Sequence, residues 1–494
     1  MTRRLEVRTG VYVDSVTLMQ VSRRVGQVDG VDAALVAMAT DLNLELATGM
    51  GFDVPNDVSP NQMLVAVDAD TDDAADAAIA ELAAALTETS RPAATGFGVP
   101  PAALTTGAAA RRSDPATTVA LISTPGQHAF ADAVDAVAAG LTTMVFSDNV
   151  PLEQEVALKR YADAAGVLVM GPDCGTAVVR GLGLGFANVV RPGPVALVAA
   201  SGTGAQQLMS LLDLAGVGVT HCLGVGGRDL SAAVGGLSTL RALDLLDADP
   251  DVELIVVISK PPAYSVAEKV RSHAARLSTP VRFGLLGPGQ PDLTATAEGV
   301  VGALGRHWSA PERWSGGVGR GRAGGFLRGL FSGGTLCDEA MLIATERLGP
   351  IASNIPLPGA PSLGAQLAAD GHAMIDFGDD ELTRGRPHPM IDGTARTERI
   401  LAEVADPGAG VLLLDVVLGH GADEDPAAGL VGPVRAAVEA RLPVVACVVG
   451  TRGDPQDLLR QCAALGDAGA AVHLSNADAT RTALDLLDPD GRPR

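Results

Sequence analysis

The chain has 494 residues, 47% of them apolar and 3% aromatic, and its formal net charge is −22. This length predicts three or four domains with cores of Ala, Val and Leu, and the negative charge disfavours a nucleic-acid partner because phosphate backbones would be repelled. The first residues lack an apolar signal core, and no apolar run approaches the roughly 18 residues of a membrane span. We therefore expect a cytoplasmic protein with no membrane partner.

The cysteines give no sign of a metal site or a disulfide framework. They are scattered along the chain and form no CxxC pair: Cys174, Cys222, Cys337, Cys447 and Cys462. A zinc knuckle or a disulfide scaffold would need closer or repeated spacing. We therefore expect a reducing setting and no bound metal.

Residues 1–110 predict a small N-terminal α/β module. The apolar residues alternate between extended and helical patterns. These patterns predict strands over 5–13, 32–38 and 63–69, and helices over 16–25 and 72–86. The second helix begins with two acidic residues, which suits the positive end of a helix dipole.

Residues 111–191 predict a Rossmann-like domain. Short apolar strands, each followed by a helical pattern, indicate a parallel sheet, with strands over 118–124, 142–148 and the start of 167–176. The loops 147–151 and 171–176 follow strands, at the edge where open α/β sheets bind ligands. A plain capped turn is the alternative interpretation of each loop.

Two further α/β units are predicted at 192–305 and 326–494. Their expected strands are 195–200, 217–226, 254–260 and 281–287 in the first unit, and 375–378, 411–419 and 443–450 in the second. The segment 306–325 between them holds six glycines, four arginines and both tryptophans, which predicts a flexible basic linker that docks through Trp side chains. The fold class is therefore α/β, with several Rossmann-like and flavodoxin-like parallel-sheet domains.

Each of these two units opens a helix with a Ser-Gly start. Small residues there leave backbone N–H groups free at a positively polarised helix N-terminus, which suits an anion. No Lys follows the first start and Gln207 breaks a dinucleotide fingerprint, so we expect two helix N-termini to share one phosphate. The alternative is generic helix-start chemistry. The predicted phosphate-binding residues are Ser201, Gly202, Thr203, Gly204, Ser332, Gly333, Gly334 and Thr335.

Several longer strings resemble a known family. They are DSVTLM (14–19), FAN (186–188), ASGTG (200–204), GVGGRDLS (224–231), SKPPA (259–263), GRPHPMID (385–392) and LLLDVVLG (412–419). In this order they resemble FdrA proteins and, more widely, the succinyl-CoA synthetase superfamily of acyl-CoA ligases with its two subunits fused. The resemblance implies a coenzyme A-binding type of domain at 111–191 and CoA-ligase-like domains at 192–305 and 326–494.

The FdrA resemblance implies an oxamate carbamoyltransferase of allantoin catabolism. In that reaction the carbamoyl group of oxalurate passes to phosphate, which gives oxamate and carbamoyl phosphate. The expected partners are phosphate, a small carbamoyl or acyl substrate, and other protein subunits. Helix N-termini can neutralise and position the attacking phosphate without a metal.

The sequence also departs from the acyl-CoA ligases. The loop where they carry a phosphorylated His reads GPGQPDLTATAEG (287–299) here and contains no His. No stretch resembles their nucleotide-grasping domain, and the Gly-rich first turn that holds coenzyme A is missing. We therefore expect no cofactor, with coenzyme A left open.

Polar residues near the Gly-rich loops receive provisional roles. Gly226, Gly227 and Asp229 are predicted to bind phosphate or substrate, and the fork of Arg228 between them would suit a substrate carboxylate. The alternative is an Arg–Asp pair that braces the loop. Cys174 has no recognisable base nearby, so we expect a small buried side chain.

His388 lies between two prolines in a stiff extended segment, as a general acid or base requires. A surface His in a proline turn is the alternative, and His420 competes for the same role. The predicted catalytic residues are His388 and Arg228. Three functions stay open: carbamoyl transfer, an acyl-CoA synthetase subunit that borrows a nucleotide domain in trans, and a non-catalytic scaffold or anion sensor.

Overall fold

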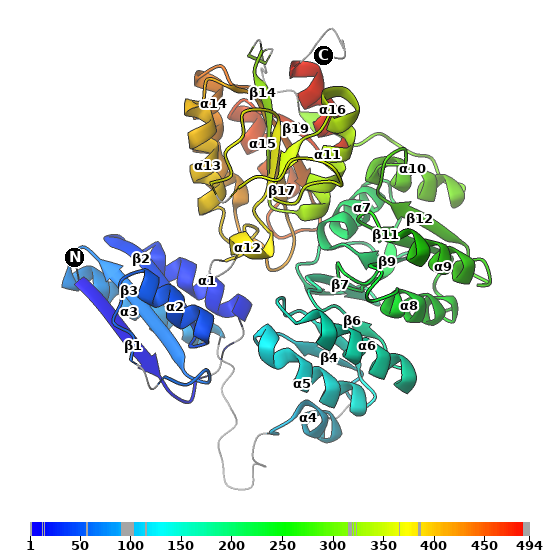
Figure 1. Cartoon of the computed structure of the whole chain (residues 1–494), viewed down its shortest axis with the longest axis horizontal. Helices are drawn as coiled ribbons and strands as arrows, with labels where there is room; N and C mark the ends of the chain where they lie inside the picture. The colour runs from blue at the N-terminus through cyan, green and yellow to red at the C-terminus, as the bar shows by residue number, and fades with distance from the viewer. Residues whose placement is uncertain are drawn as a thin grey trace.

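Figure 1 shows a computed structural model of the chain, in which four α/β units follow one another along the sequence. The α/β fold class with several parallel-sheet domains is confirmed. Among the helices that the structure describes, none has the length and apolar character needed to cross a bilayer. The described residues are 2–11, 13, 15–55, 58–89, 103–113, 116–314, 319, 321–322, 324–364, 366–383 and 387–487.

The N-terminal module is an antiparallel sheet in the order β1-β3-β2, with helices on both faces. The elements are β1 (Thr2–Arg8), α1 (Ser15–Gly26), β2 (Val31–Met38), α2 (Asp41–Gly49), β3 (Met63–Ala69) and α3 (Asp72–Thr89). Alternate side chains of β3 point to opposite faces. Met63 and Val65 pack with α1 and α3, whereas Leu64 and Ala66 pack on the side of α2.

The predicted strand over 5–13 was too long. It ends at Arg8 because Gly10 follows with a φ of +72°, a left-handed conformation that leaves the strand. The helix α2 was not predicted. Its start is capped by Thr40, whose hydroxyl accepts a hydrogen bond of 3.4 Å from the backbone N–H of Asn43.

The second unit is a short parallel sheet in the order β4-β5-β6. Its elements are α4 (Thr106–Arg112), β4 (Val119–Ile122), α5 (Gly126–Ala138), β5 (Thr142–Val145), α6 (Leu152–Ala165) and β6 (Val169–Met170). The loops that follow β4, β5 and β6 contribute residues to the cavity described below.

The third unit is a sheet in the order β12-β11-β9-β10-β7-β8. Its elements are β7 (Thr176–Val179), β8 (Leu182–Gly185), β9 (Val195–Ala200), α7 (Gly202–Leu214), β10 (Val219–Gly224), α8 (Leu237–Asp247), β11 (Leu254–Ser259), α9 (Tyr264–Ala274), β12 (Val281–Leu285) and α10 (Leu293–Ala303). The hairpin β7-β8 precedes residue 192 and yet pairs with β10, so this sheet begins earlier in the chain than the expected unit.

The fourth unit is a sheet in the order β13-β19-β18-β17-β14-β16-β15, parallel except for β13. Its strands are β13 (Arg313–Trp314), β14 (Phe326–Phe331), β15 (Ala352–Ser353), β16 (Ala373–Asp376), β17 (Ala409–Val417), β18 (Val444–Val449) and β19 (Ala471–His473). Its helices are α11 (Gly334–Leu348), α12 (Asp380–Thr383), α13 (Thr394–Ala405), α14 (Pro426–Glu439), α15 (Leu458–Asp467) and α16 (Asn476–Leu487).

The segment expected to be a linker is partly structured. Trp314 lies in β13, which pairs with β19, and both Trp308 and Trp314 are partly buried against apolar cores. Residues 315–318, 320 and 323 of this segment lie outside the described part of the chain, as do Gly385 and Arg386 of the GRPHPMID string.

The third and fourth units share one apolar core, in which α7 and α10 pack against α11 and α16. Gln207 crosses this interface. Its side-chain nitrogen donates to the carbonyl of Leu474 at 3.0 Å, and its side-chain oxygen accepts from the N–H of Asn476 at 3.1 Å. The Gln that breaks a dinucleotide fingerprint in the sequence therefore joins two domains.

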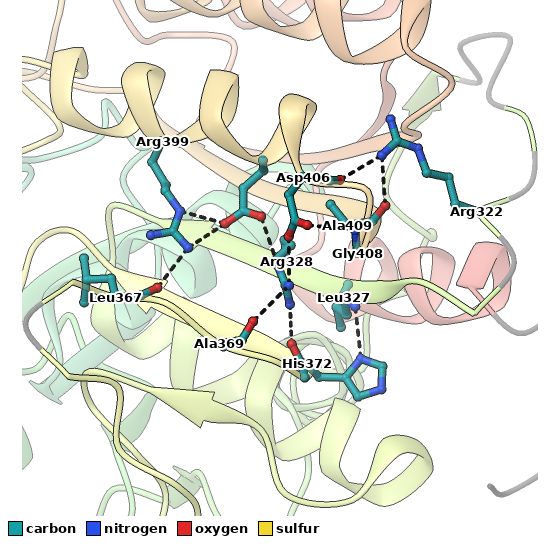
Figure 2. A network of polar contacts seen from close by, with 12 residues as sticks. Arg322, Leu327, Arg328, Leu367, Ala369, His372, Arg399, Asp406, Gly408 and Ala409 are labelled. Carbon is teal, nitrogen blue, oxygen red and sulfur yellow. Dashed lines mark hydrogen bonds and ion pairs between the residues drawn. The ribbon is translucent and has the colours of Figure 1, made fainter.

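A buried ion network fixes the amino end of β14 (Figure 2). Arg328 donates to Glu403 at 3.0 Å and to Asp406 at 3.2 Å, both near the end of α13, and to the carbonyl of Ala369 at 3.3 Å. Loss of one member of such a buried pair leaves an uncompensated charge. Because the network anchors β14, it also helps to fix the position of Ser332, which directly follows the carboxyl end of this strand.

Candidate functional site

The N-termini of α7 and α11 meet directly. The hydroxyl of Ser201 accepts a hydrogen bond of 3.0 Å from the N–H of Gly204, which caps α7, and donates one of 2.7 Å to the hydroxyl of Thr335. The two expected helix starts, which are more than 130 positions apart, therefore lie side by side. Their free backbone N–H groups and positive dipole ends converge.

Small residues permit this close approach. A side-chain carbon at Gly333 would lie 2.6 Å from a methyl carbon of Thr203, and one at Gly204 would lie 2.9 Å from the methyl carbon of Thr335. Real contacts of this kind are essentially never so short. Larger residues would push the two helix starts apart.

Two buried charged residues, Asp415 and Arg396, hold Ser332 in place through hydrogen bonds. Its N–H and hydroxyl both donate to Asp415, at 2.7 and 2.8 Å, and Arg396 donates to the hydroxyl of Ser332 at 2.8 Å and to Asp415 at 2.7 Å. Burial lowers the pKa of Arg396 and raises the pKa of Asp415, while each charge partly offsets the shift of the other. This cluster fixes the loop that opens α11.

Lys260 places a positive charge beside the paired helix starts. Lys260 directly follows β11, and its ammonium lies 3.8 Å from Asp338 and 2.9 Å from the point that a side-chain carbon at Gly334 would occupy. Burial opposes its charge, but Asp338, Asp376 and Asp173 prevail and raise the pKa of Lys260. Lys260 therefore stays charged beside the N-terminus of α11.

Two carboxyl groups near Lys260 titrate close to neutral pH. Burial raises the pKa of Asp376 to about 7, and desolvation together with the charges of Asp380 and Asp148 raises the pKa of Asp173 to about 7, although Lys260 pulls both pKa values down. One oxygen of Asp376 accepts from the N–H of Gly378 at 2.9 Å, and the other lies 2.6 Å from the point that a side-chain carbon at Gly334 would occupy. Both groups can hold or release a proton at the site.

His388 supplies a neutral hydrogen-bond donor. Burial, helped by the charge of Arg396, lowers the pKa of His388 to about 4. The N–H of Met390 donates to Nδ1 at 3.2 Å, so the proton of the neutral ring is carried by Nε2. The ring also packs against Phe186, with centroids 5.8 Å apart.

These groups surround a cavity of about 530 Å³, a size suited to a small ligand. All four units contribute to it. The predicted residues that line it are Ser201, Gly202, Thr203, Gly226, Gly227, Ser332, Gly333, Gly334, Thr335 and His388. Gly204, Arg228 and Asp229 are not among its lining residues.

Arg228 and Asp229 lie in a loop brace rather than at the cavity. Asp229 is completely buried and accepts from Lys159 at 2.8 Å and from the N–H of Thr239 at 2.9 Å. Arg228 forms an ion pair with Glu155 at 2.9 Å. Both partners Lys159 and Glu155 come from α6, so this brace joins the GVGG loop to the second unit.

The structure also places His420, Cys174 and the loop after β12, which the sequence analysis considered. His420 is exposed and is absent from the cavity lining. Cys174 lines the cavity, but burial raises the pKa of its thiol to about 12, which disfavours a nucleophile. The loop after β12 is fully described and holds no His.

The sequence analysis missed Lys260, Asp376 and Gln206. The first two end predicted parallel strands, a position that would have singled them out as site candidates. Gln206 lies in the second turn of α7, is 1% exposed and lines the cavity, and its side-chain nitrogen has no hydrogen-bond partner. A buried unpaired donor at this place points to a ligand with an acceptor oxygen.

Two family models match the chain. Residues 1–99 match the AllF, heavy metal-associated domain, and residues 330–486 match the CoA-ligase family. Protein sites for heavy metals commonly use Cys thiolate and His imidazole, and residues 1–99 contain neither residue. The described residues also hold no group of three or more His, Cys, Asp or Glu side chains that could bind a metal ion. The N-terminal module therefore does not fit a heavy-metal site.

Individual relatives extend these matches. The alpha subunit of the ADP-forming succinate–CoA ligase of Methanothermobacter thermautotrophicus is 26% identical over 141 residues, which are 28% of this chain and 46% of that subunit. The solved dinucleotide-forming acetyl-coenzyme A synthetase 1 of Ca. Korarchaeum cryptofilum, in complex with phosphate and ADP, is 18% identical with a TM-score of 0.31, over 80% of this chain and 87% of that one.

The uncharacterized protein YahF of Escherichia coli (strain K12) is 34% identical over 516 residues, and the match covers 99% of each chain. The similarity thus includes the N-terminal module, both predicted helix starts and the loop that carries His388. The chain belongs to the same family as YahF, and it combines an AllF-type N-terminal domain with a CoA-ligase domain in one polypeptide.

Proposed function

We propose that the chain is an acyl-transfer enzyme that holds phosphate, or the phosphate end of an acyl phosphate, at the paired starts of α7 and α11. The contact between Ser201 and Thr335 carries this proposal, because it brings two helix N-termini together at one cavity. The charged Lys260 and the unpaired amide of Gln206 provide independent support.

The chemistry follows from the groups in the cavity. Phosphate bound at the helix starts attacks the acyl carbon, the bond from this carbon to the leaving group breaks, and the proton of the phosphate ends on the leaving group. The Nε2–H of His388 is available to stabilise the oxygen that becomes negative. Asp376 or Asp173, with a pKa of about 7, can relay the proton.

The comparisons favour an acyl-CoA synthetase-like role. The CoA-ligase match and the similarity to a succinate–CoA ligase subunit support coenzyme A as the acyl acceptor. In this form of the proposal the chain is one subunit, and a nucleotide-binding domain is supplied by another protein.

A second candidate is carbamoyl transfer between oxalurate and phosphate. The loop after β12 favours it, because this loop holds no His that could carry a phosphohistidine. Free phosphate would then attack oxalurate directly, and oxamate would leave. The FdrA resemblance remains the basis for this substrate.

Isotope exchange tests the proposal and separates the candidates. Radioactive phosphate is incubated with the protein and either acetyl phosphate or carbamoyl phosphate, each with coenzyme A, with oxamate or alone. Exchange that depends on coenzyme A supports the synthetase-like role, and exchange that depends on oxamate supports carbamoyl transfer. Phosphate binding without exchange under any condition would contradict both candidates and favour an anion sensor.

A further inference from the structure

One wall of the cavity comes from the N-terminal module. Residues of α1, of β2 and of the segments beside them line it, including Leu18, Met19, Leu35, Met38 and Asn43. Among the residues that the structure describes, every lining residue of the module is uncharged. The wall therefore consists of apolar and neutral polar side chains.

The other walls are strongly polar. They carry Lys260, Asp173, Asp376 and the two helix starts, together with the neutral donor His388. A ligand in this cavity thus meets the ammonium of Lys260, carboxyl groups and N–H donors at one end and a neutral surface at the other. Burial of a charged group against the neutral wall would be costly, because the described residues of this wall offer no partner of opposite charge.

The module is held in place by a specific ion pair. Arg23 of α1 lies 2.7 Å from Asp423 of the fourth unit, and it also donates to the carbonyl of Ile391, a residue of the cavity lining. Met19 lies one helical turn before Arg23, and it packs against the core shared by the third and fourth units. The face of α1 that carries Met19 is therefore fixed over the cavity.

We propose that the N-terminal module determines acyl specificity, and that it selects an acyl phosphate whose acyl group is small and uncharged. The inference rests on the proposed function, because it places the phosphate end at the starts of α7 and α11. A dicarboxylic acyl group, such as succinyl, would direct its second carboxylate at the neutral wall. The module then acts as a specificity element rather than a metal-binding domain.

A matched pair of stable probes tests this inference. Butanoylphosphonate and 3-carboxypropanoylphosphonate have equal length and differ in a terminal methyl or carboxylate group, and their affinities are measured by titration calorimetry on the full chain. We expect the uncharged probe to bind about tenfold more tightly or better. In Met19→Lys the ratio of the two affinities should fall or reverse, because a cation then faces the carboxylate.

Two further variants separate a change in specificity from a general effect on the protein. Asn43→Lys places a cation on the same wall from another element and should shift the ratio in the same direction. Met50→Lys lies in the same module outside the cavity lining and should leave the ratio unchanged. The ratio is insensitive to a general loss of folded protein, since both probes are affected equally.

The outcomes separate this inference from the proposed function. Equal affinities for the two probes, or a ratio that neither Met19→Lys nor Asn43→Lys alters, would overturn the role of the module while the phosphate site stands. Failure of the unmodified protein to bind inorganic phosphate or either probe would overturn the phosphate site and this inference with it.

Discussion

Ser201 and Thr335 are hydrogen-bonded through their hydroxyl groups at 2.7 Å, and each belongs to the start of a helix in a different domain. A single helix N-terminus attracts an anion weakly at a surface, whereas two that converge in a cavity act together. This contact is therefore the structural basis for placing phosphate between the third and fourth units.

Removal of the charge of Lys260 should weaken phosphate binding. We expect Lys260→Met to raise the dissociation constant for phosphate roughly 10- to 100-fold, the range of a charge-assisted hydrogen bond. The matched control is Lys269→Met, because Lys269 is exposed and donates to the carbonyl of Gly235 at 2.9 Å, away from the cavity lining. Calorimetric titration would measure both, and equal affinities in the two variants would remove Lys260 from the site.

A methyl group at Gly334 should block the site without removing any polar group. It would lie 2.6 Å from an oxygen of Asp376 and 2.9 Å from the ammonium of Lys260, so Gly334→Ala should lower phosphate affinity by about tenfold or more. Gly302→Ala is the control, since that residue is exposed in α10 with nothing nearby. Unchanged phosphate affinity in Gly334→Ala would show that the anion lies elsewhere.

Anion binding should weaken as pH rises through about 7. The pKa values of Asp376 and Asp173 are raised to about 7, by burial for Asp376 and by desolvation with the nearby charges of Asp380 and Asp148 for Asp173. Below this pH they are protonated and neutral, and above it two negative charges face the anion, so affinity is lost on the alkaline side. Sulfate is the suitable probe, because it keeps its double negative charge from pH 5.5 to 8.5.

The same titration in Asp376→Asn checks the origin of this effect. Since one ionising group is removed, the affinity should fall less steeply with pH. Asp467→Asn, an exposed residue of α15, serves as control and should behave like the unmodified protein. A profile that is flat in all three proteins would contradict the assignment.

His388 should act as a neutral donor throughout the working pH range. Its pKa of about 4 means that the ring is uncharged from pH 5.5 to 8.5. We expect His388→Phe to weaken butanoylphosphonate but not inorganic phosphate, by about tenfold, and equally at both ends of this range. His420→Phe, an exposed residue, should have no effect. A defect confined to acidic pH would instead indicate a charged imidazole.

Local sequence patterns predicted the helix starts correctly in position, because a Ser-Gly sequence after a buried strand has few structural outcomes. The position of Lys260 after a predicted strand marks it as a candidate, but the sequence does not show that it faces the start of α11, because this contact depends on β11 lying beside β9 and on how the third and fourth units pack. Strand order and the packing of whole units are set by contacts far from residue 260 in the sequence.

For Arg228 and Asp229, the sequence suggested a ligand contact where the structure has an ion-paired loop brace. Their Gly-rich loop resembles a ligand loop, but the partners that bury Asp229 and pair with Arg228 are Lys159 and Glu155, about 70 residues earlier in α6. A buried ion pair and a substrate contact require the same residue types. The distinction therefore needs the tertiary structure.

The most direct test of the phosphate site is an anomalous difference map from crystals soaked in selenate, a phosphate-shaped anion with a strong anomalous signal. The account predicts a peak within hydrogen-bond distance of the backbone N–H groups that open α7 and α11 and of the ammonium of Lys260. A map with selenate peaks elsewhere and none between Ser201 and Thr335 would contradict it.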